Sequence, residues 1–315
     1  MAVQPERRDE YPPSPFASKS GKVSTCPKGK MQLQWLALGY RSTKACTGTA
    51  AGHLKPCPHT QLLHKEERGQ PLLTIPTDFP AWLTAWMEAC QIPLWGAADL
   101  REFATPVDQD GSRFPSALSF AIPMDPQIMA SIQNGPNQAY ADDYARVNEH
   151  INTLSAALAA KIKERGFRAS PLAASERTDA VKIVGDFPHK TAATRAGLGW
   201  VGRHCQLVTH SFGPWVRLGT VFADLELSCG PPIEQDYCGG CKRCVEACPA
   251  QALTGNTWIP GRAREEILDA WACDQWKKDH YYQYHKGHNC GICAAVCPYG
   301  LRTLRRGCLV EEKEG

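Results

Sequence analysis

The sequence lacks the features that mark membrane proteins and strongly charged proteins. No apolar run approaches the length of about 18 residues that a membrane span needs, so no contact with a membrane is expected. The 35 Lys and Arg residues are nearly balanced by 32 Asp and Glu. A formal net charge of +3 is too small to identify a nucleic-acid-binding protein from bulk electrostatics, so any such contact requires a local patch.

A usable export signal is also lacking. Arg7 and Arg8 form a pair like that of a twin-arginine signal, but acidic residues, a tyrosine and prolines occupy positions 9–13, where such a signal has an apolar segment. We therefore expect a cytoplasmic protein. Cysteines stay reduced in that compartment, so a cluster of them indicates a metal site or catalysis more often than disulfides.

The length and the local composition predict several parts. The chain has 315 residues, and 43% of them are hydrophobic, which suffices for a sizeable core. Residues 1–74 show no sustained helical or strand period and are predicted to form a poorly ordered extension. The other predicted parts are an α/β cofactor and substrate domain over 75–229, a cysteine-rich domain over 230–300, and a C-terminal tail over 301–315.

Hydrophobic periodicity predicts both helices and strands within residues 75–229. Trp82 and Trp86 have helical spacing, and apolar residues recur at steps of three and four from Val147 to Ile162, before Gly166 ends the helix. Strands are predicted over 116–123, 205–209 and 216–223. This mixture predicts an α+β fold.

Eight of the fifteen cysteines lie between positions 238 and 297, in two runs. The first run, Cys238-x2-Cys241-x2-Cys244-x3-Cys248-Pro249, is the pattern with which bacterial ferredoxins bind [4Fe–4S] clusters. The second run has only three cysteines, and Cys273, between the runs, restores the total to eight. The sequence therefore predicts two [4Fe–4S] clusters.

The spacing assigns four thiolates to each cluster, because the fourth cysteine of such a run ligates the neighbouring cluster. The predicted ligand sets are Cys238, Cys241, Cys244 and Cys297 for one cluster, and Cys248, Cys273, Cys290 and Cys293 for the other. A pair of zinc sites is the alternative, since thiolate tetrads also bind zinc. Two cysteine runs that each end in Cys-Pro favour iron–sulfur clusters.

A glycine-rich stretch precedes the cysteines, at the point where a predicted helix gives way to strands. Glycines at positions 197, 199 and 202 admit positive φ and allow the backbone to approach a ligand closely. A helix C-cap followed by a turn explains the bare pattern about as well. Taken with the eight cysteines, the stretch resembles the epoxyqueuosine reductase family of cobalamin-dependent iron–sulfur enzymes and its double-cluster relatives. The resemblance runs from about Ser116 to Gly300.

The resemblance implies a fold, cofactors and a reaction. It implies a nitroreductase-like α/β domain that binds cobalamin, followed by a bacterial ferredoxin-like domain with two [4Fe–4S] clusters. The implied reaction is the reduction of an epoxide on the queuosine base of tRNA, with electrons from a low-potential donor of the ferredoxin or flavodoxin type. A protein acid would protonate the leaving oxygen. The residues implied for the cofactor domain are Gly197, Gly199, Trp200, Gly202 and Arg203.

The proton donor is where the chain departs from the family. The family's Asp-Tyr-His motif reads Asp143-Tyr144-Ala145, its catalytic aspartate has no counterpart in register, and its C-terminal helical repeats do not follow the second cysteine run. The candidates are Tyr144 and, just before the glycines, Asp186 and His189. We favour His189, because an imidazole titrates near neutral pH, whereas Asp186 is equally explained as a helix N-cap.

Two other functions remain open. The chain is alternatively an electron-transfer protein without cobalamin, or a reductive-dehalogenase-like enzyme, which is disfavoured because those enzymes are generally exported. Residues 276–288 interleave basic and aromatic side chains, a composition that suits contact with tRNA. A solvated loop between two cluster ligands is the alternative for that stretch.

Overall fold

The computed structural model describes residues 78–311, with side chains to residue 304. These residues lie within one compact unit, Pro56–Gly315. The predicted extension over 1–74 and the end of the predicted tail, residues 312–315, lie outside the described residues. No helix in the described part of the chain has the length and apolar character needed to cross a membrane.

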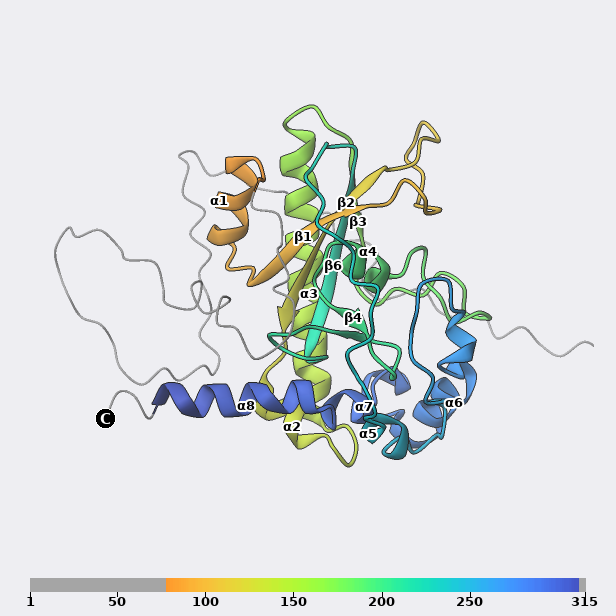
Figure 1. Ribbon diagram of the computed structural model, residues 1–315. Coiled ribbons are helices and arrows are strands. Elements are labelled where there is room, and N and C mark those ends of the chain that lie inside the picture. The colour runs from red at the N-terminus through yellow and green to blue at the C-terminus, as the bar shows by residue number, and fades with distance from the viewer. Residues whose placement is uncertain (1–77, 312–315) are drawn as a thin grey trace, which may run out of the picture. The chain divides into compact units, whose positions relative to one another are not determined.

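A four-stranded antiparallel sheet forms the centre of the fold (Figure 1). In order across the sheet the strands are β1 (Leu94–Asp99), β2 (Ser116–Pro123), β6 (Val216–Ala223) and β3 (Ala169–Leu172). Phe120 of β2 lies directly opposite Gly219 of β6, and a Cβ at position 219 would overlap the Phe120 ring. The central strand pair therefore requires glycine at that position.

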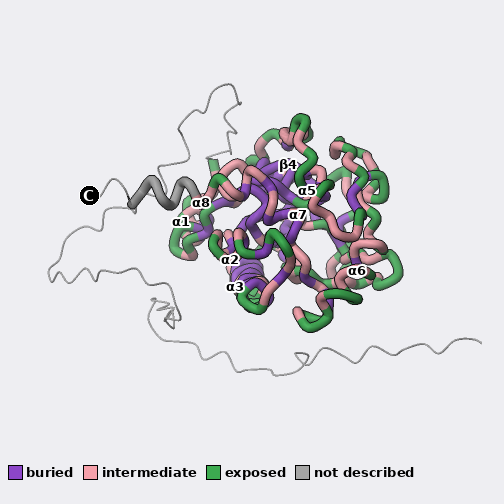
Figure 2. Tube along the Cα trace, turned by 90° about the horizontal axis from the view of Figure 1, so that it is seen from below, coloured by how far each residue is buried: buried purple, intermediate pink, exposed green. Residues whose placement is uncertain are grey.

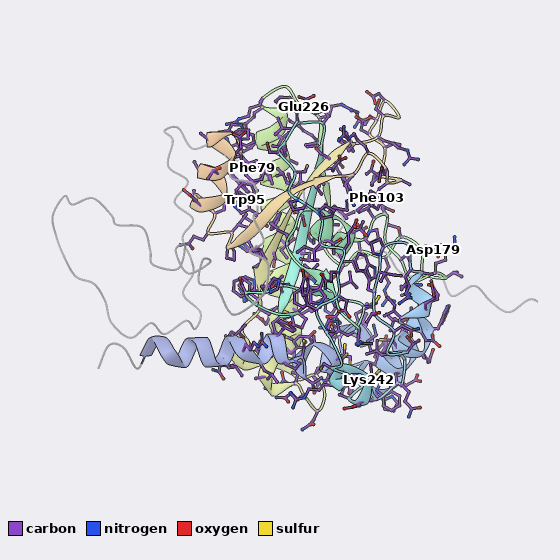
Figure 3. The ribbon with its side chains drawn as sticks, in the orientation of Figure 1. Phe79, Trp95, Phe103, Asp179, Glu226 and Lys242 are labelled. Carbon is purple, nitrogen blue, oxygen red and sulfur yellow. The ribbon has the colours of Figure 1, made fainter. Side chains whose placement is uncertain are left out.

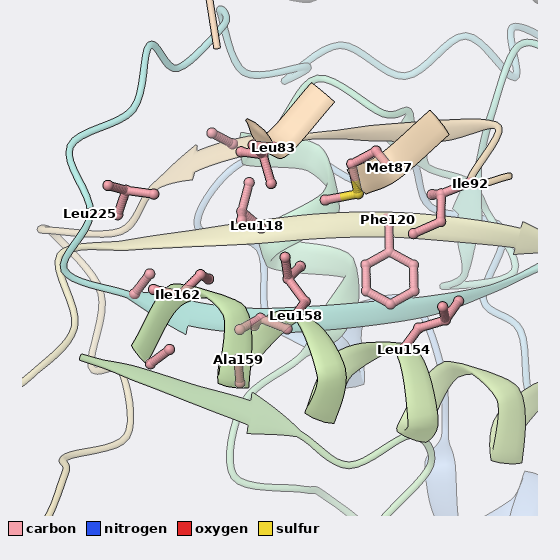
Figure 4. Packing of buried hydrophobic residues seen from close by; sticks show 14 of the residues in the cluster. Leu83, Met87, Ile92, Leu118, Phe120, Leu154, Leu158, Ala159, Ile162 and Leu225 are labelled. Carbon is pink, nitrogen blue, oxygen red and sulfur yellow. The ribbon is translucent and has the colours of Figure 1, made fainter. Parts of the chain in front are cut away.

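Helices cover both faces of this sheet. Helices α1 (Ala81–Ala89) and α3 (Gln138–Lys163) pack on the face that presents Leu118 and Phe120 (Figure 4). Helix α4 (His189–Arg195) packs on the other face, against Ala117 and Ala121. Because side chains alternate along a strand, β2 is apolar on both sides, as a strand between two helical layers must be. Before α1, Phe79 lies beside Trp95, with ring centroids 4.6 Å apart (Figure 3).

Most of the predicted elements are present, and the mixed class of helices and sheet is confirmed. The predicted strands 116–123 and 216–223 are β2 and β6. The predicted strand 205–209 is shorter, as β5 (Leu207–Val208), and pairs with β4 (Trp200–Val201) in a separate hairpin. The periodic helix begins earlier than predicted, where the Asn137 side chain accepts the Tyr140 backbone N–H at 2.9 Å.

The residues after the sheet form short helices joined by loops. Helix α6 has mostly exposed and partly buried residues, whereas buried residues gather around α7 (Figure 2). The remaining elements are α2 (Pro126–Ser131), α5 (Arg243–Glu246), η3 (Arg264–Glu266), α6 (Ala270–Tyr281), η4 (His285–Gly287), α7 (Ile292–Ala295) and α8 (Pro298–Glu311).

Trp215, just before β6, joins the cysteine segment to the sheet. It is 1% exposed, and its indole N–H donates to the backbone oxygen of Ala294 at 2.8 Å. A Cβ at Gly300 would overlap the Trp215 indole, and one at Gly213 would overlap the backbone of Gly300. Close backbone approach at these glycines fixes the cysteine segment against the end of β6.

The substitution Leu158→Ala tests the packing of α3 on the sheet. Leu158 is fully buried among Leu118, Phe120 and Val221, so its truncation leaves a cavity. We expect the free energy of unfolding to fall by about 2–5 kcal/mol. The control is Glu149→Ala, at an exposed position of the same helix. In denaturant titrations it should change the free energy of unfolding by less than about 0.5 kcal/mol. Equal effects of the two substitutions would contradict the described packing.

Candidate functional site

The two cysteine runs fold in the same way. Short helices α5 and α7 carry Cys244 and Cys293, and each run closes with a Cys-Pro step. The tight loops before these helices contain Gly239 with φ 55° and Gly291 with φ 80°, a backbone conformation that favours glycine. The repeated local structure presents cysteines from both runs toward each other, and α5 contacts α7.

The first predicted ligand set is brought together around Cys244. Burial and the neighbouring Cys297 and Cys241 raise the pKa of the Cys244 thiol to about 11. Cys238 belongs to the same loop, because its backbone oxygen accepts the Cys241 N–H at 3.1 Å. Cys297, from the second run, thus lies beside cysteines of the first run, as the ferredoxin pattern predicts.

The second predicted set gathers around Cys290 and Cys293. Burial raises the pKa of Cys290 to about 11, and Cys273 and Cys248 contribute in the same direction. Burial also raises the pKa of Cys293, with Cys290, Cys273, Cys244 and Cys248 as its neighbours. Since Cys244 belongs to the first set, the two sets are adjacent.

The donor chemistry of these cysteines fits iron–sulfur clusters. All eight thiols are free of disulfides. The Ala252 N–H donates to Cys248 Sγ at 3.4 Å, and Gln206 Nε2 donates to Cys293 Sγ at 3.5 Å. Four thiolates around one zinc lie only about 3.8 Å apart, given Zn–S bonds of about 2.3 Å. In the described part of the chain, no three Cys, His, Asp or Glu side chains are grouped for a single metal ion.

The glycine-rich stretch faces the cysteine segment. Trp200 is 0% exposed, and its ring lies 4.8 Å from that of Tyr299 and 5.1 Å from that of Tyr237, measured between centroids. The Arg203 guanidinium donates to the backbone oxygens of Gly239, at 2.6 Å, and Gly255. These contacts connect the hairpin of β4 and β5 to both sides of the first cysteine run.

The predicted cofactor residues are therefore used in packing. Gly197, Gly199 and Gly202 are buried, and a Cβ at Gly199 would overlap the backbone of Val208 in β5. Trp200 has no exposed surface with which its side chain could contact a cofactor. Cobalamin binding by this stretch stays a prediction, and the side-chain contacts at Trp200 and Arg203 do not fit that role.

A polar group on α3 and β6 forms a second candidate site. Arg217 of β6 donates to the Tyr144 hydroxyl at 2.9 Å, and its guanidinium carbon lies 4.1 Å from the centroid of the Tyr144 ring. Arg217 also donates to Asn148 Oδ1 at 3.0 Å. Ser175, which has φ 62°, places its hydroxyl 3.0 Å from that of Tyr144 and also contacts Arg217. Backbone strain in a non-glycine residue is common at functional sites.

Arg217 controls the acidity of Tyr144. Burial opposes ionisation of this phenol, but the positive charge of Arg217 and hydrogen bonds from Ser175 and Asn148 outweigh it, so the pKa of Tyr144 is lowered. Arg217 was not among the predicted residues. Its signal in the sequence is a charged residue inside the apolar strand 216–223.

Tyr140 links this site to the second cysteine set. Its ring lies 6.0 Å from that of Tyr144, one helical turn away on α3. A Cβ at Gly291, between Cys290 and Cys293, would lie 2.9 Å from the Tyr140 hydroxyl. Tyr140 thus lies close both to Tyr144 and to the loop that carries Cys290 and Cys293.

A buried ion-pair network ties the Ser175 loop to the same cysteines. Arg177 donates to Asp274 at 2.6 Å, and Asp274, which is 3% exposed, follows Cys273 on α6. Burial opposes ionisation of Asp274, but hydrogen bonds from Arg177 and Lys278 hold the pKa of its carboxyl below the usual range. The ion pair therefore connects α6 to the loop that carries Ser175.

His189 and Asp186 occupy different environments from Tyr144. His189 is hydrogen-bonded through both ring nitrogens, to Thr220 Oγ1 at 2.9 Å and to the Ala173 oxygen at 3.1 Å. Burial lowers the pKa of His189 to about 4. Asp186 is exposed, and Pro188 rather than Asp186 is the N-cap of α4. These contacts favour Tyr144 over His189 as a proton donor.

The predicted tRNA-contact stretch, residues 276–288, covers part of α6 and η4. Trp276 and His280 stack with centroids 3.8 Å apart, and Tyr282 is 63% exposed. His285 lies 6.1 Å from Tyr144 between ring centroids, so this stretch reaches the polar site. Contact with tRNA stays a prediction.

Comparison with known families supports the cluster site. Residues 237–300 match the family described as 4Fe-4S double cluster binding domain. This range contains all eight cysteines of the two sets.

Comparison with known proteins confirms the resemblance to epoxyqueuosine reductases. The chain is 31% identical over 182 residues to the epoxyqueuosine reductase of Gloeobacter violaceus, covering 55% of this chain and 53% of that protein. It is 36% identical over 115 residues to the tetrachloroethene reductive dehalogenase of Sulfurospirillum multivorans, covering 34% of this chain and 22% of that protein. The chain thus spans about half, or less, of the curated relatives it matches.

Among solved structures, the fold is similar to that of a reductive dehalogenase described in connection with B12-dependent dehalogenation. The TM-score is 0.55 at 19% identity, over 80% of this chain and 37% of that chain. This similarity supports the arrangement of helices and sheet described above.

The substitution Arg217→Gln tests the electrostatic coupling to Tyr144. Burial disfavours the phenolate form of Tyr144, whereas the guanidinium charge favours it. Removal of that charge should therefore raise the pKa of Tyr144. Tyrosinate absorbance should be titrated in each protein and in its Tyr144→Phe derivative, and the difference gives the Tyr144 curve. The control Arg101→Gln, 75% exposed and paired with Asp99, should leave that curve unchanged. A Tyr144 curve unaltered by Arg217→Gln would refute the coupling.

Proposed function

We propose that the chain is an iron–sulfur reductase of the epoxyqueuosine reductase type, acting in the cytoplasm, in which two [4Fe–4S] clusters supply electrons to a substrate site at Tyr144 and Arg217. The observation that carries the proposal is the adjacency of two sets of thiols to this polar pair, through Tyr140 and Gly291. In this proposal the sheet and its helices are a nitroreductase-like domain over 75–229, and residues 230–300 are a bacterial ferredoxin-like domain.

The proposed cluster ligands follow the two sets. Cys238, Cys241, Cys244 and Cys297 bind one cluster, and Cys248, Cys273, Cys290 and Cys293 bind the other. The neighbours of Cys244 and of Cys290 support this division. A low-potential ferredoxin or flavodoxin would reduce the clusters from outside.

The proposed substrate is the epoxide of epoxyqueuosine in tRNA. Removal of the epoxide oxygen as water, with formation of an alkene, consumes two electrons and two protons. In this proposal Tyr144 donates one proton to the departing oxygen and Arg217 stabilises the resulting phenolate, a role supported by the hydrogen bond between the two residues. Cobalamin, which the resemblance implies, supplies a reducing cobalt nucleophile when bound.

Reductive dehalogenation is the second candidate function. The local identity of 36% to a tetrachloroethene reductive dehalogenase and the similar fold favour it. A tyrosine with a lowered pKa beside an arginine would serve equally to protonate carbon after halide loss. Activity on epoxyqueuosine tRNA, compared with activity on halogenated alkenes and phenols, separates the two functions.

Iron content tests the ligand assignment. Anaerobic reconstitution of the full chain should yield about eight irons per chain. Cys273→Ala should lose about four irons or destabilise one cluster, whereas Cys90→Ala, outside the two sets, should retain all of them. Zinc as the stoichiometric metal, or full iron content in Cys273→Ala, would contradict the assignment.

Single-turnover rates test the proton donor. With pre-reduced protein and epoxyqueuosine-containing tRNA, Tyr144→Phe should lower the rate about 10²- to 10⁴-fold, because the ring remains and only the acidic hydroxyl is lost. Cluster content should not change. The control Thr153→Val removes an exposed hydroxyl from the same helix, away from Arg217, and should leave the rate unaltered.

The same single-turnover rate should be measured for His189→Gln. If it slows turnover by a similar factor while Tyr144→Phe keeps the parent rate, the proton donor is His189, as the sequence predicted. If no variant, Asp186→Asn included, affects turnover, water is the donor and the assignment to Tyr144 fails.

A further inference from the structure

We propose that the loop of the first cysteine run, with Lys242, Arg243 and Arg302 around it, is the surface on which an acidic electron-carrier protein docks. Electrons then enter at the first cluster and leave through the second. The inference rests on the proposed function, because it requires a cluster at the first run, but it does not depend on the substrate.

The loop of the first run is open, whereas that of the second run is covered. A Cβ at Gly239 or at Gly240 would meet no atom within 4 Å, and both glycines are exposed. In the second run, a Cβ at Gly291 would lie 2.5 Å from the Ile132 side chain and 2.9 Å from the Tyr140 hydroxyl. The two runs thus share a local fold but differ in access, and the first is the one that another protein can approach.

Basic side chains lie at both ends of this open loop. Lys242 and Arg243 are exposed where the loop enters α5 (Figure 3). At the other end, the exposed Arg302 has its guanidinium carbon 4.7 Å from the centroid of the Tyr299 ring. The Tyr299 hydroxyl in turn donates at 3.1 Å to the backbone oxygen of Tyr237, the residue before the first cysteine. The loop is therefore flanked by cations.

These three cations are not neutralised within the protein. In the described part of the chain none of them forms an ion pair, whereas Arg195, for example, pairs with Glu234 at 3.2 Å. Of the nearby carboxylates, Asp236 accepts the backbone N–H of Cys238 at 2.9 Å, and Glu246 is exposed at the end of α5. Uncompensated positive charge at a surface attracts an acidic partner and speeds its approach.

An electron carrier fits this surface better than tRNA does. Reduction by a protein requires its redox centre to approach the cluster closely, and the open loop permits that approach. The proposed tRNA substrate must instead reach Tyr144, which lies beside Tyr140 and so on the side of the second run. Complexes of electron-transfer proteins have small interfaces, and charge complementarity mainly sets their rate of association.

The test is the rate at which a reduced acidic flavodoxin reduces the clusters of the reconstituted full chain, followed by stopped-flow absorbance without substrate. The double variant of Lys242→Glu with Arg243→Glu should lower the second-order rate constant about tenfold at low ionic strength. Added salt should slow the parent but not the variant, because salt screens an attraction that the variant lacks. The control, Lys161→Glu with Lys163→Glu, makes the same change in charge at the end of α3 and should keep the parent rate.

A cationic small reductant separates docking from damage to the cluster. The reduced methyl viologen radical is positively charged, so it should reduce the double variant at least as fast as the parent. Slow reduction by both reductants with full iron content would overturn the proposal, because the substitutions would then act on the cluster itself. Unchanged rates with flavodoxin would also overturn it. If the double variant loses iron, Arg302→Glu decides by the same two rates, since Arg302 belongs to α8 and lies outside the loop.

Affinity for tRNA, measured on the same variants, identifies the other occupant of a basic surface. If the double variant keeps the parent rate with flavodoxin but binds tRNA more weakly, the surface contacts nucleic acid and the proposal is wrong. A parent chain without iron would refute both this proposal and the proposed function. Normal reduction by flavodoxin without activity on epoxyqueuosine-containing tRNA would refute only the proposed function.

Discussion

The close contact of the cysteine segment with the end of β6 is the constraint on which the remaining structure depends. Trp215 is buried there, and glycine at positions 213 and 300 lets the two backbones approach. The same strand then carries Arg217, two residues along, to the hydroxyl of Tyr144. One anchoring indole therefore sets both the position of the cysteines and the position of the polar site.

The charge of Arg217 is tolerated inside an apolar strand because its guanidinium has three hydrogen-bond partners. Tyr144, Asn148 and Ser175 surround the guanidinium, and they come from α3 and from the loop after β3. A buried charge without such partners would strongly destabilise the fold. The arrangement keeps a cation beside a phenol and close to the second cysteine set. This is the electrostatic environment that a proton donor in a reductase needs, because it favours the anion left after proton transfer.

The parts of the structure that the sequence predicted are those governed by local pattern. Cysteine spacing predicted that each run folds as a tight loop and a short helix, and the division of the eight thiols into two ligand sets stays a prediction. Periodicity predicted β2, β6 and most of α3, because each presents a continuous apolar surface. β3, with only four residues, lies below the length at which alternation is distinguishable.

The parts that the sequence did not predict depend on contacts between distant residues. Arg217 meets Tyr144 across 73 positions, and neither position signals the other. His189 was favoured for its ordinary pKa, but burial lowers that pKa in the fold, against the opposite effect of the hydrogen bond to Ala173. Glycines typical of ligand binding were equally consistent with tight packing, and at Gly199 the packing is what the structure describes.

The most direct measurement of the central claim is the electron balance of one turnover. Clusters of the full chain are reduced beforehand, excess reductant is removed, and epoxyqueuosine-containing tRNA is added anaerobically. If the clusters supply the site at Tyr144 and Arg217, two reducing equivalents disappear from the protein for each queuosine formed. Clusters that stay reduced in the presence of this tRNA, with no queuosine formed, would contradict the account.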